Sequence, residues 1–137
     1  MCSSDLLRIV LEEGLEPRIV RHLRNARALW AGIEAMGLVL HVDEKHRLTP
    51  LTTVRVPEGI DEMAIRTGLL LEHNIEIGRG FGALEGQVWR IGLMGYGSSE
   101  ENVFALLYAL ETQLARQKFG LDHGAGVAAA ARAYASA

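Results

Sequence analysis

Hydrophobic positions in the first part of the chain have helical spacing. Residues 6–13 form a short helical stretch that Gly14 ends, and residues 17–36 form a longer one with Pro17 in its first turn. Gly37 follows the last apolar position of the longer stretch. Its apolar stripe has members three and four residues apart: Ile19, Leu23, Ala26, Trp30 and Ile33. Two consecutive helices are therefore predicted here.

The middle of the chain changes to short apolar stretches of the kind that form strands. They cover residues 38–42, 51–56, 75–77 and 88–93. A polar turn joins the first pair, and a glycine-rich loop joins the second. Between the pairs, Asp61 is a favourable N-cap for a helix that continues to about His73. Two pairs of strands with one helix between them are therefore predicted.

The last clearly patterned element is a helix that begins with Ser98 and Glu101, which form a capping box. Its stripe consists of Val103, Leu106, Leu107, Leu110 and Leu114. From Gly120 onward the sequence is rich in alanine and glycine, and no element is predicted there. The order of elements predicts an α+β fold, with a small antiparallel or mixed sheet and helices packed on one face.

Composition limits the possible partners. A length of 137 residues is sufficient for one domain with a core, and 49% hydrophobic residues with 23% charged residues are typical of a globular protein. The net charge of −3 argues against nucleic acid as a main partner. No apolar run approaches the ~20 residues of a membrane span, so no membrane partner is expected. The single cysteine, Cys2, and a start without secretion features favour a cytoplasmic protein.

One charged residue, Arg90, lies inside an otherwise apolar predicted strand. Alternation places it on one face with Val88 and Gly92, and it places Trp89, Ile91 and Leu93 on the other. The bulky face is predicted to meet the core. Because an unpaired buried guanidinium is costly, Arg90 is either a solvated arginine on an open sheet face or an anion-binding residue that something else covers.

The loop before that strand matches G-x-G-x-x-A over residues Gly78, Arg79, Gly80, Phe81, Gly82 and Ala83. A dinucleotide site needs a helix directly after such glycines, but another predicted strand follows here, which argues against that fold. A loop with positive φ angles is the simplest interpretation. In its functional version the loop approaches a ligand closely, which makes Gly78, Arg79, Gly80 and Gly82 possible active-site residues.

Other chemistry is sparse. The five histidines, at positions 22, 41, 46, 73 and 123, lack ligand spacing, so no metal site is predicted. Arginines recur every three residues at positions 18, 21, 24 and 27, which predicts a solvated helix face. The sequence contains no nucleophile elbow or Ser-His-Asp arrangement, and no catalytic residue is assigned to this chain.

Three segments carry a resemblance to a known family: LTTVRVPEGID (51–61), IEIGRGFGALEGQVWRIGLMG (75–95) and ENVFALLYALE (101–111). They resemble the C-terminal small domain of class V pyridoxal-phosphate-dependent aminotransferases, which include alanine–glyoxylate, serine–pyruvate and serine–glyoxylate enzymes. In that family the arginine of the RIGLMG strand receives the substrate's α-carboxylate. The resemblance therefore implies this role for Arg90.

The chain also departs from the family pattern. Arg79 stands where the family usually has a small residue, Phe81 where it has leucine and Gln87 where it has lysine. Arg79 is therefore expected to crowd or recharge the loop beside the active site. Residues 1–5 do not look like family sequence. Residues 6–117 are expected to form the small domain, and residues 118–137 an alanine- and glycine-rich tail.

The resemblance implies catalysis by residues that this chain does not carry. In the family a large domain supplies the lysine that binds pyridoxal 5'-phosphate covalently and the groups that hold its ring. The two lysines of this chain, Lys45 and Lys118, lie outside any such motif. The cofactor is therefore expected to be bound mainly by an absent large domain, and the isolated chain is expected to be inactive.

The resulting expectation is a domain of a transaminase that moves an amino group between alanine or serine and glyoxylate or pyruvate. Its expected partners are a small amino acid or 2-oxo acid, the large domain and a second copy in a homodimer. From another class, a free-standing, non-catalytic α/β module that binds small acids or a partner protein through Arg90 stays open. A member of the same superfamily that acts on an aminophosphonate or a sulfur compound also stays open.

Overall fold

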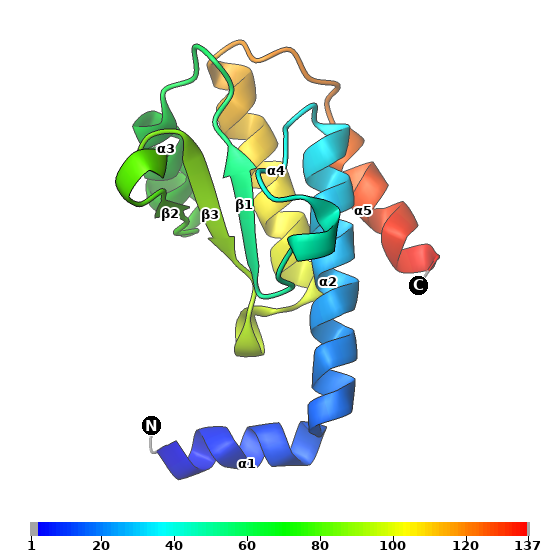
Figure 1. Cartoon of the computed structure of the whole chain (residues 1–137). Coiled ribbons are helices and arrows are strands. Elements are labelled where there is room, and N and C mark those ends of the chain that lie inside the picture. The colour runs from blue at the N-terminus through cyan, green and yellow to red at the C-terminus, as the bar shows by residue number, and fades with distance from the viewer. Residues whose placement is uncertain (1–2, 137) are drawn as a thin grey trace.

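The computed structural model describes residues 3–136 as helices around one small sheet (Figure 1). The helices are α1 (Ser3–Glu13), α2 (Leu15–Ala35), α3 (Glu62–His73), α4 (Glu100–Arg116) and α5 (Ala125–Ala135). The strands are β1 (Leu51–Arg55), β2 (Gly78–Arg79) and β3 (Val88–Gly92). Short 3-10 turns occupy η1 (Glu44–His46), η2 (Gly82–Leu84) and η3 (Gly95–Gly97). None of the helices in the described part is long and apolar enough to cross a membrane.

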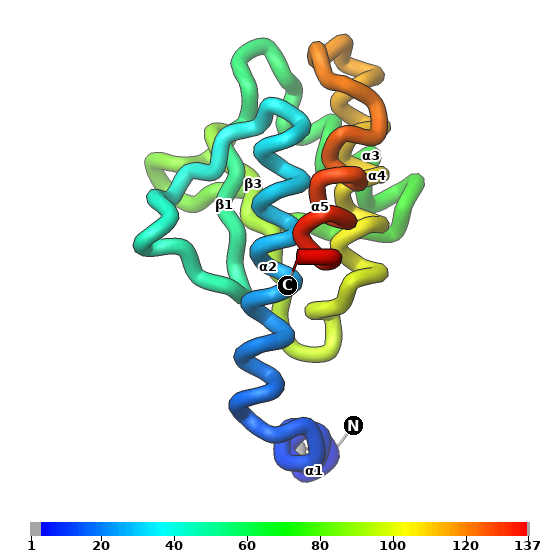
Figure 2. Tube along the Cα trace, turned by 90° about the vertical axis from the view of Figure 1, so that its right-hand side faces the viewer, coloured from blue at the N-terminus to red at the C-terminus, as the bar shows by residue number. Residues whose placement is uncertain are grey.

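The three strands form one antiparallel sheet in the order β1–β3–β2, with β3 in the centre. The helices gather on one face of this sheet (Figures 1 and 2). Trp89, Ile91 and Leu93 point into the core on that face and are buried. These observations confirm the predicted α+β class, the antiparallel pairing and the packing of helices on one face.

The predicted strand at 38–42 is not a strand. Its pairing with β1 is limited to one bridge, between Leu40 and Val54. The amide of Leu38 still donates to the carbonyl of Ile33 at the end of α2. Because Leu38 is still hydrogen-bonded to the end of α2, only Leu40 is placed to form a bridge with β1.

The predicted strand at 75–77 is also wrong. Asn74 adopts a left-handed conformation, φ 55°, that caps α3, and the amide of Ile75 donates back to the carbonyl of Leu69. Pairing with β3 begins only at Gly78. The first residue of the predicted strand, Ile75, is therefore part of the helix cap instead of the sheet.

The core lies between the sheet and the helices. The predicted stripe of α4, from Val103 to Leu114, is buried throughout. The largest fully buried side chains from other elements include Leu29, Ile33, Ile65, Leu69 and Trp89. Each such side chain contributes about 1.5–3 kcal/mol on burial. The apolar periodicity therefore identified the α4 part of the core, whereas Leu29, Ile65 and Leu69 were not assigned to it from the sequence.

Helix α5 arises from the alanine- and glycine-rich tail, where the sequence predicted no element. It packs along α2 (Figure 2), and glycines make the close approach possible. A Cβ on Gly32 would lie 3.0 Å from the carbonyl oxygen of Gly126, and a Cβ on Gly126 would lie 2.9 Å from Met36. The small residues therefore form a helix interface rather than a tail without structure.

The N-cap of α4 is one residue later than predicted. The side chain of Ser99 accepts the hydrogen bond from the amide of Asn102. Ser98 is instead buried, and its hydroxyl accepts a hydrogen bond from the side chain of Asn25. The serine assigned to the capping box thus joins the loop after β3 to α2.

Helix α1 and the beginning of α2 project from the body (Figures 1 and 2). Their apolar side chains are largely exposed; the fractions are 63% for Leu7, 81% for Leu11 and 67% for Leu15. Ile19, a predicted stripe residue, is also 57% exposed. This projecting arm, residues 3–20, therefore carries apolar side chains that the described residues do not cover.

Candidate functional site

Arg90 lies in the middle of the sheet on the face opposite the buried Trp89 and Ile91. In register beside it are Thr53 of β1 and Gly78 of β2. Because paired residues in an antiparallel sheet point to the same side, the three form one row across the face. Because Thr53 and Gly78 are small, they leave Arg90 partly exposed. The row is therefore an open part of the sheet face with one positive charge at its centre, here called the platform.

Two contacts fix the guanidinium of Arg90. Its Nε donates a hydrogen bond of 2.8 Å to the carbonyl oxygen of Arg79. Its Cζ lies 3.8 Å from the centre of the Phe81 ring, which stacks against the cation. Within residues 3–136, Nη1 and Nη2 have no hydrogen-bond or ion-pair partner. The outer edge of the guanidinium is therefore available to an anion.

The glycines of the preceding segment have different roles. Gly78 belongs to β2, and a Cβ there would lie 3.1 Å from Nη2 of Arg90. Gly80 is buried against the backbone of Leu84. Gly82 has φ +54° and open space around it, so its need for glycine is conformational. Only Gly78 therefore has a direct steric relation to Arg90.

Arg79 contributes its backbone rather than its side chain to the arginine site. It pairs with Trp89, which places its side chain on the face away from Arg90. Its guanidinium forms a 2.7 Å ion pair with Glu85, and both groups are exposed. The Arg79 side chain therefore does not contact Arg90; its effect on the loop beside the active site stays a prediction.

Val88 shows where the open face ends. It shares a face with Arg90, yet it is buried. The chain around Gly80 covers it, since a Cβ on Gly80 would lie 2.9 Å from Cγ2 of Val88. The loop from β2 to β3 thus closes one end of the platform, and Arg90 lies at the edge of this cover.

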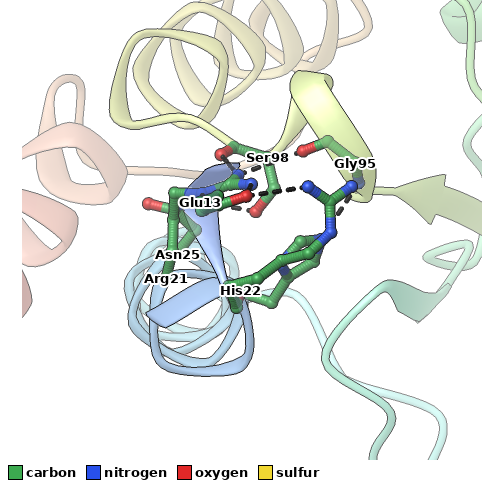
Figure 3. A network of polar contacts seen from close by, with 7 residues as sticks. Glu13, Arg21, His22, Asn25, Gly95 and Ser98 are labelled. Carbon is green, nitrogen blue, oxygen red and sulfur yellow. Dashed lines mark hydrogen bonds and ion pairs between the residues drawn. The ribbon is translucent and has the colours of Figure 1, made fainter. Parts of the chain in front are cut away.

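The turn after β3 is held by Arg21 of α2 (Figure 3). Its Nε and Nη2 donate to the two carboxylate oxygens of Glu13 at 2.5 and 2.9 Å. Its Nη1 donates to the carbonyls of Gly95 and Ser98 at 3.0 and 2.5 Å. Arg21, with help from Arg18, lowers the pKa of Glu13 to about 2. Neither arginine is part of the predicted solvated face.

His22 adds a second tie to the same turn (Figure 3). Its Nε2 accepts a 3.0 Å hydrogen bond from the amide of Gly95. The proton must then be on Nδ1, which donates to the carbonyl of Arg18 at 2.7 Å. The side chains of Arg21 and His22 were not recognised from the sequence, because nothing in the helical pattern distinguishes them from surface residues.

A groove of about 850 Å³ separates α1 from the turn after β3. Its walls are apolar on the α1 side, at Leu6, Ile9 and Val10, and Tyr96 borders it on the other side. Tyr96 is 94% exposed. The groove therefore extends the uncovered apolar surface of the projecting arm to the end of the strand that carries Arg90.

Within residues 3–136, neither lysine lies in an enclosed pocket of the kind that holds a covalently bound cofactor. Lys45 lies in η1 and Lys118 lies beyond α4, and both side chains are exposed. Within residues 3–136 there is also no cluster of side chains suited to a metal ion.

No family model matches the chain. The (S)-ureidoglycine–glyoxylate transaminase of Bacillus subtilis is 45% identical to it over 131 residues, which are 96% of this chain and 32% of that protein. The mouse (Mus musculus) alanine–glyoxylate aminotransferase is 38% identical over 114 residues, 82% of this chain and 28% of that protein. A crystal structure of the B. subtilis ureidoglycine–glyoxylate aminotransferase matches with a TM-score of 0.91 and 45% identity, over 93% of this chain and 33% of the other.

The chain is homologous to one domain of class V aminotransferases. The resemblance inferred from the sequence segments is therefore confirmed. The chain spans about a third of the length of the curated relatives that it matches. Since these relatives are aminotransferases, the family implies a reaction that depends on pyridoxal phosphate.

Proposed function

We propose that this chain is the small domain of a class V aminotransferase and supplies the arginine that binds the substrate carboxylate. The observation that carries this proposal is the arrangement of Arg90. Its Nε is already bonded to the backbone, while Nη1 and Nη2 are unpartnered within the described residues. A planar guanidinium holds a carboxylate through two parallel hydrogen bonds, which suits this free edge.

The proposed reaction is amino transfer between alanine or serine and glyoxylate or pyruvate. Glyoxylate occurs in the names of both similar enzymes. Ureidoglycine, in the name of the B. subtilis relative, is a further donor to test. All these substrates carry a carboxylate, so one arginine can serve donor and acceptor in turn. Bound pyridoxal phosphate would supply the electron-accepting chemistry.

A large domain is proposed to hold the cofactor and to cover the projecting arm. Three features support this division of labour: the chain spans a third of its relatives, its lysines are exposed, and apolar residues such as Leu7 and Leu11 lie uncovered on α1. The complete enzyme is proposed to be a cytoplasmic homodimer. Residues 6–117 would form its small domain, with residues 118–137 added to that domain through α5.

The test is a fusion in which this chain replaces the matching region of the B. subtilis relative. With pyridoxal phosphate present, the fusion should transfer amino groups from alanine, serine or ureidoglycine to glyoxylate or pyruvate. The isolated chain should show no turnover with the same substrates. Turnover by the isolated chain, or a folded and cofactor-loaded fusion without activity on any pair, would contradict the proposal.

The same experiment addresses the alternative of a non-catalytic binding module. If the chain were such a module, its fusion would fold and bind pyridoxal phosphate but would transfer no amino group. The uncovered apolar surface of the projecting arm favours the enzyme domain, because a free-standing module has no reason to expose it.

A further inference from the structure

Three neighbours restrain the guanidinium of Arg90 before any ligand arrives. The carbonyl of Arg79 accepts from Nε at 2.8 Å, and the ring of Phe81 lies 3.8 Å from Cζ. The backbone of Gly78, which precedes Arg79 in β2, lies so close that a Cβ would be 3.1 Å from Nη2. The cation is thus restrained at its inner edge, on one face and beside one terminal nitrogen.

These restraints select one way of binding a carboxylate. A guanidinium can present two parallel N–H groups either from Nε and one Nη or from Nη1 and Nη2. Because Nε already donates to Arg79, the first pair is not free. The remaining fork is formed by Nη1 and Nη2, and it can accept a carboxylate only end-on.

The ring of Phe81 has no other evident task in the fold. It is 67% exposed and does not belong to the core. A ring that faces a cation attracts it through the negative charge of its π face, which an aliphatic side chain lacks. The side chain of Phe81 is therefore not needed for the core, but its ring contacts the guanidinium of Arg90 and can affect its orientation.

We infer that Phe81 is a positioning residue: its ring and the carbonyl of Arg79 hold the Arg90 guanidinium so that a substrate carboxylate binds end-on to Nη1 and Nη2. The inference rests on the proposed function, since it assigns a geometry to the same site. The inference predicts that the isolated chain has a pre-oriented carboxylate site, although the isolated chain is expected to be inactive as an enzyme.

The test uses the 137-residue chain, labelled with ¹⁵N, and acetate as the carboxylate probe with acetamide as the neutral control. Acetate should shift the signals of Arg90, Gly78 and Thr53, whereas acetamide should not. Phe81→Leu should raise the half-saturating acetate concentration about three- to fivefold and should speed exchange of the Nε proton. Phe81→Tyr keeps the ring and should stay within twofold of the unmodified chain.

Tyr108→Leu is the matched control, because it removes another exposed aromatic ring, which lies in the middle of α4 and has no contact with Arg90 among the described residues. It should change neither acetate affinity nor exchange at Arg90. The inference is overturned if Phe81→Leu leaves both readouts unchanged, if Tyr fails to replace Phe, or if acetate gives no response in the unmodified chain. Activity of the fusion is a separate readout, so these outcomes would leave the proposed function to be judged on that assay.

Discussion

Gly78 lies directly opposite Arg90 in the β2–β3 ladder, and a Cβ at this position would lie 3.1 Å from Nη2 of the arginine. The glycine therefore shapes the space around the arginine that is proposed to bind the substrate carboxylate. It keeps free the space that one terminal nitrogen of the guanidinium occupies.

Gly78→Ala should weaken carboxylate binding with little loss of stability. The added methyl group meets the end of a flexible side chain, which can move by a few tenths of an ångström but then no longer presents its fork in place. The acetate titration should show severalfold weaker binding, while the free energy of unfolding should change by less than about 1 kcal/mol. Gly120→Ala is the control, since a Cβ there meets nothing within 4 Å. Equal acetate affinity in both variants would contradict the steric account.

Gly80→Ala should show the opposite behaviour. Its Cβ would collide with the backbone carbonyl of Leu84, which cannot rotate away as a side chain can. We expect unfolding in urea at lower concentration, with about 1–3 kcal/mol lost. Stability equal to that of Gly120→Ala would show that the loop is free to rearrange.

The two glycines illustrate what the sequence could and could not establish. The pattern G-x-G-x-x-A can be read directly from the sequence. The sheet face of Arg90 can also be predicted, because the alternation of side chains along a strand is a local property. The distinct roles of Gly78 and Gly80 depend on which residue of β3 lies opposite each residue of the preceding segment. That information lies in the register of β2 against β3, and a two-residue strand gives no periodic signal.

Protonation of Glu13 should loosen α1. Its pKa in the folded chain is about 2, below the ordinary value of 4.5, mainly because Arg21 donates to it. A lowered folded pKa means that the stabilising contribution is present above about pH 4.5 and is lost as pH falls toward 2. Amide exchange in α1 should therefore be faster at pH 3 than at pH 5, after correction for intrinsic rates.

Glu13→Gln is the matched variant for this pH dependence. It keeps the size of the side chain but removes the charge that Arg18 and Arg21 hold, so α1 should exchange rapidly at both pH values. Protection of α1 that is the same in the variant and the unmodified chain would show that Glu13 does not fix the helix.

The projecting arm should make the isolated chain self-associate. Leu7 and Leu11 are one helical turn apart on α1 and are 63% and 81% exposed. Sedimentation should show association that grows with protein concentration, and the double variant Leu7→Glu/Leu11→Glu should reduce it. Leu71→Glu, on α3, removes a leucine with 75% exposure and serves as control. A monomer at every concentration would contradict this prediction.

Helix periodicity predicted the core stripe of α4, but it could not predict the interactions of Arg18 and Arg21. Their three-residue spacing is that of an ordinary charged helix face. Their partners, Glu13 and the carbonyls of Gly95 and Ser98, come together only because α1 turns away at Gly14, which has φ +83°, and because β3 ends beside α2. Helix α5 was missed for a related reason, since glycine and alanine act there through close packing rather than through an apolar stripe.

The most direct test of the central claim is the effect of Arg90→Lys and Arg90→Ala on the KM of the fusion enzyme for its amino donor. Charged hydrogen bonds contribute about 1.5–3 kcal/mol, so KM should rise roughly tenfold to 150-fold, while binding of pyridoxal phosphate and the unfolding transition should be nearly unchanged. Arg55→Lys, on the same face of β1, should leave KM within twofold. If both Arg90 variants fold and keep the original KM, or if both fail to fold, Arg90 is not the carboxylate-binding residue.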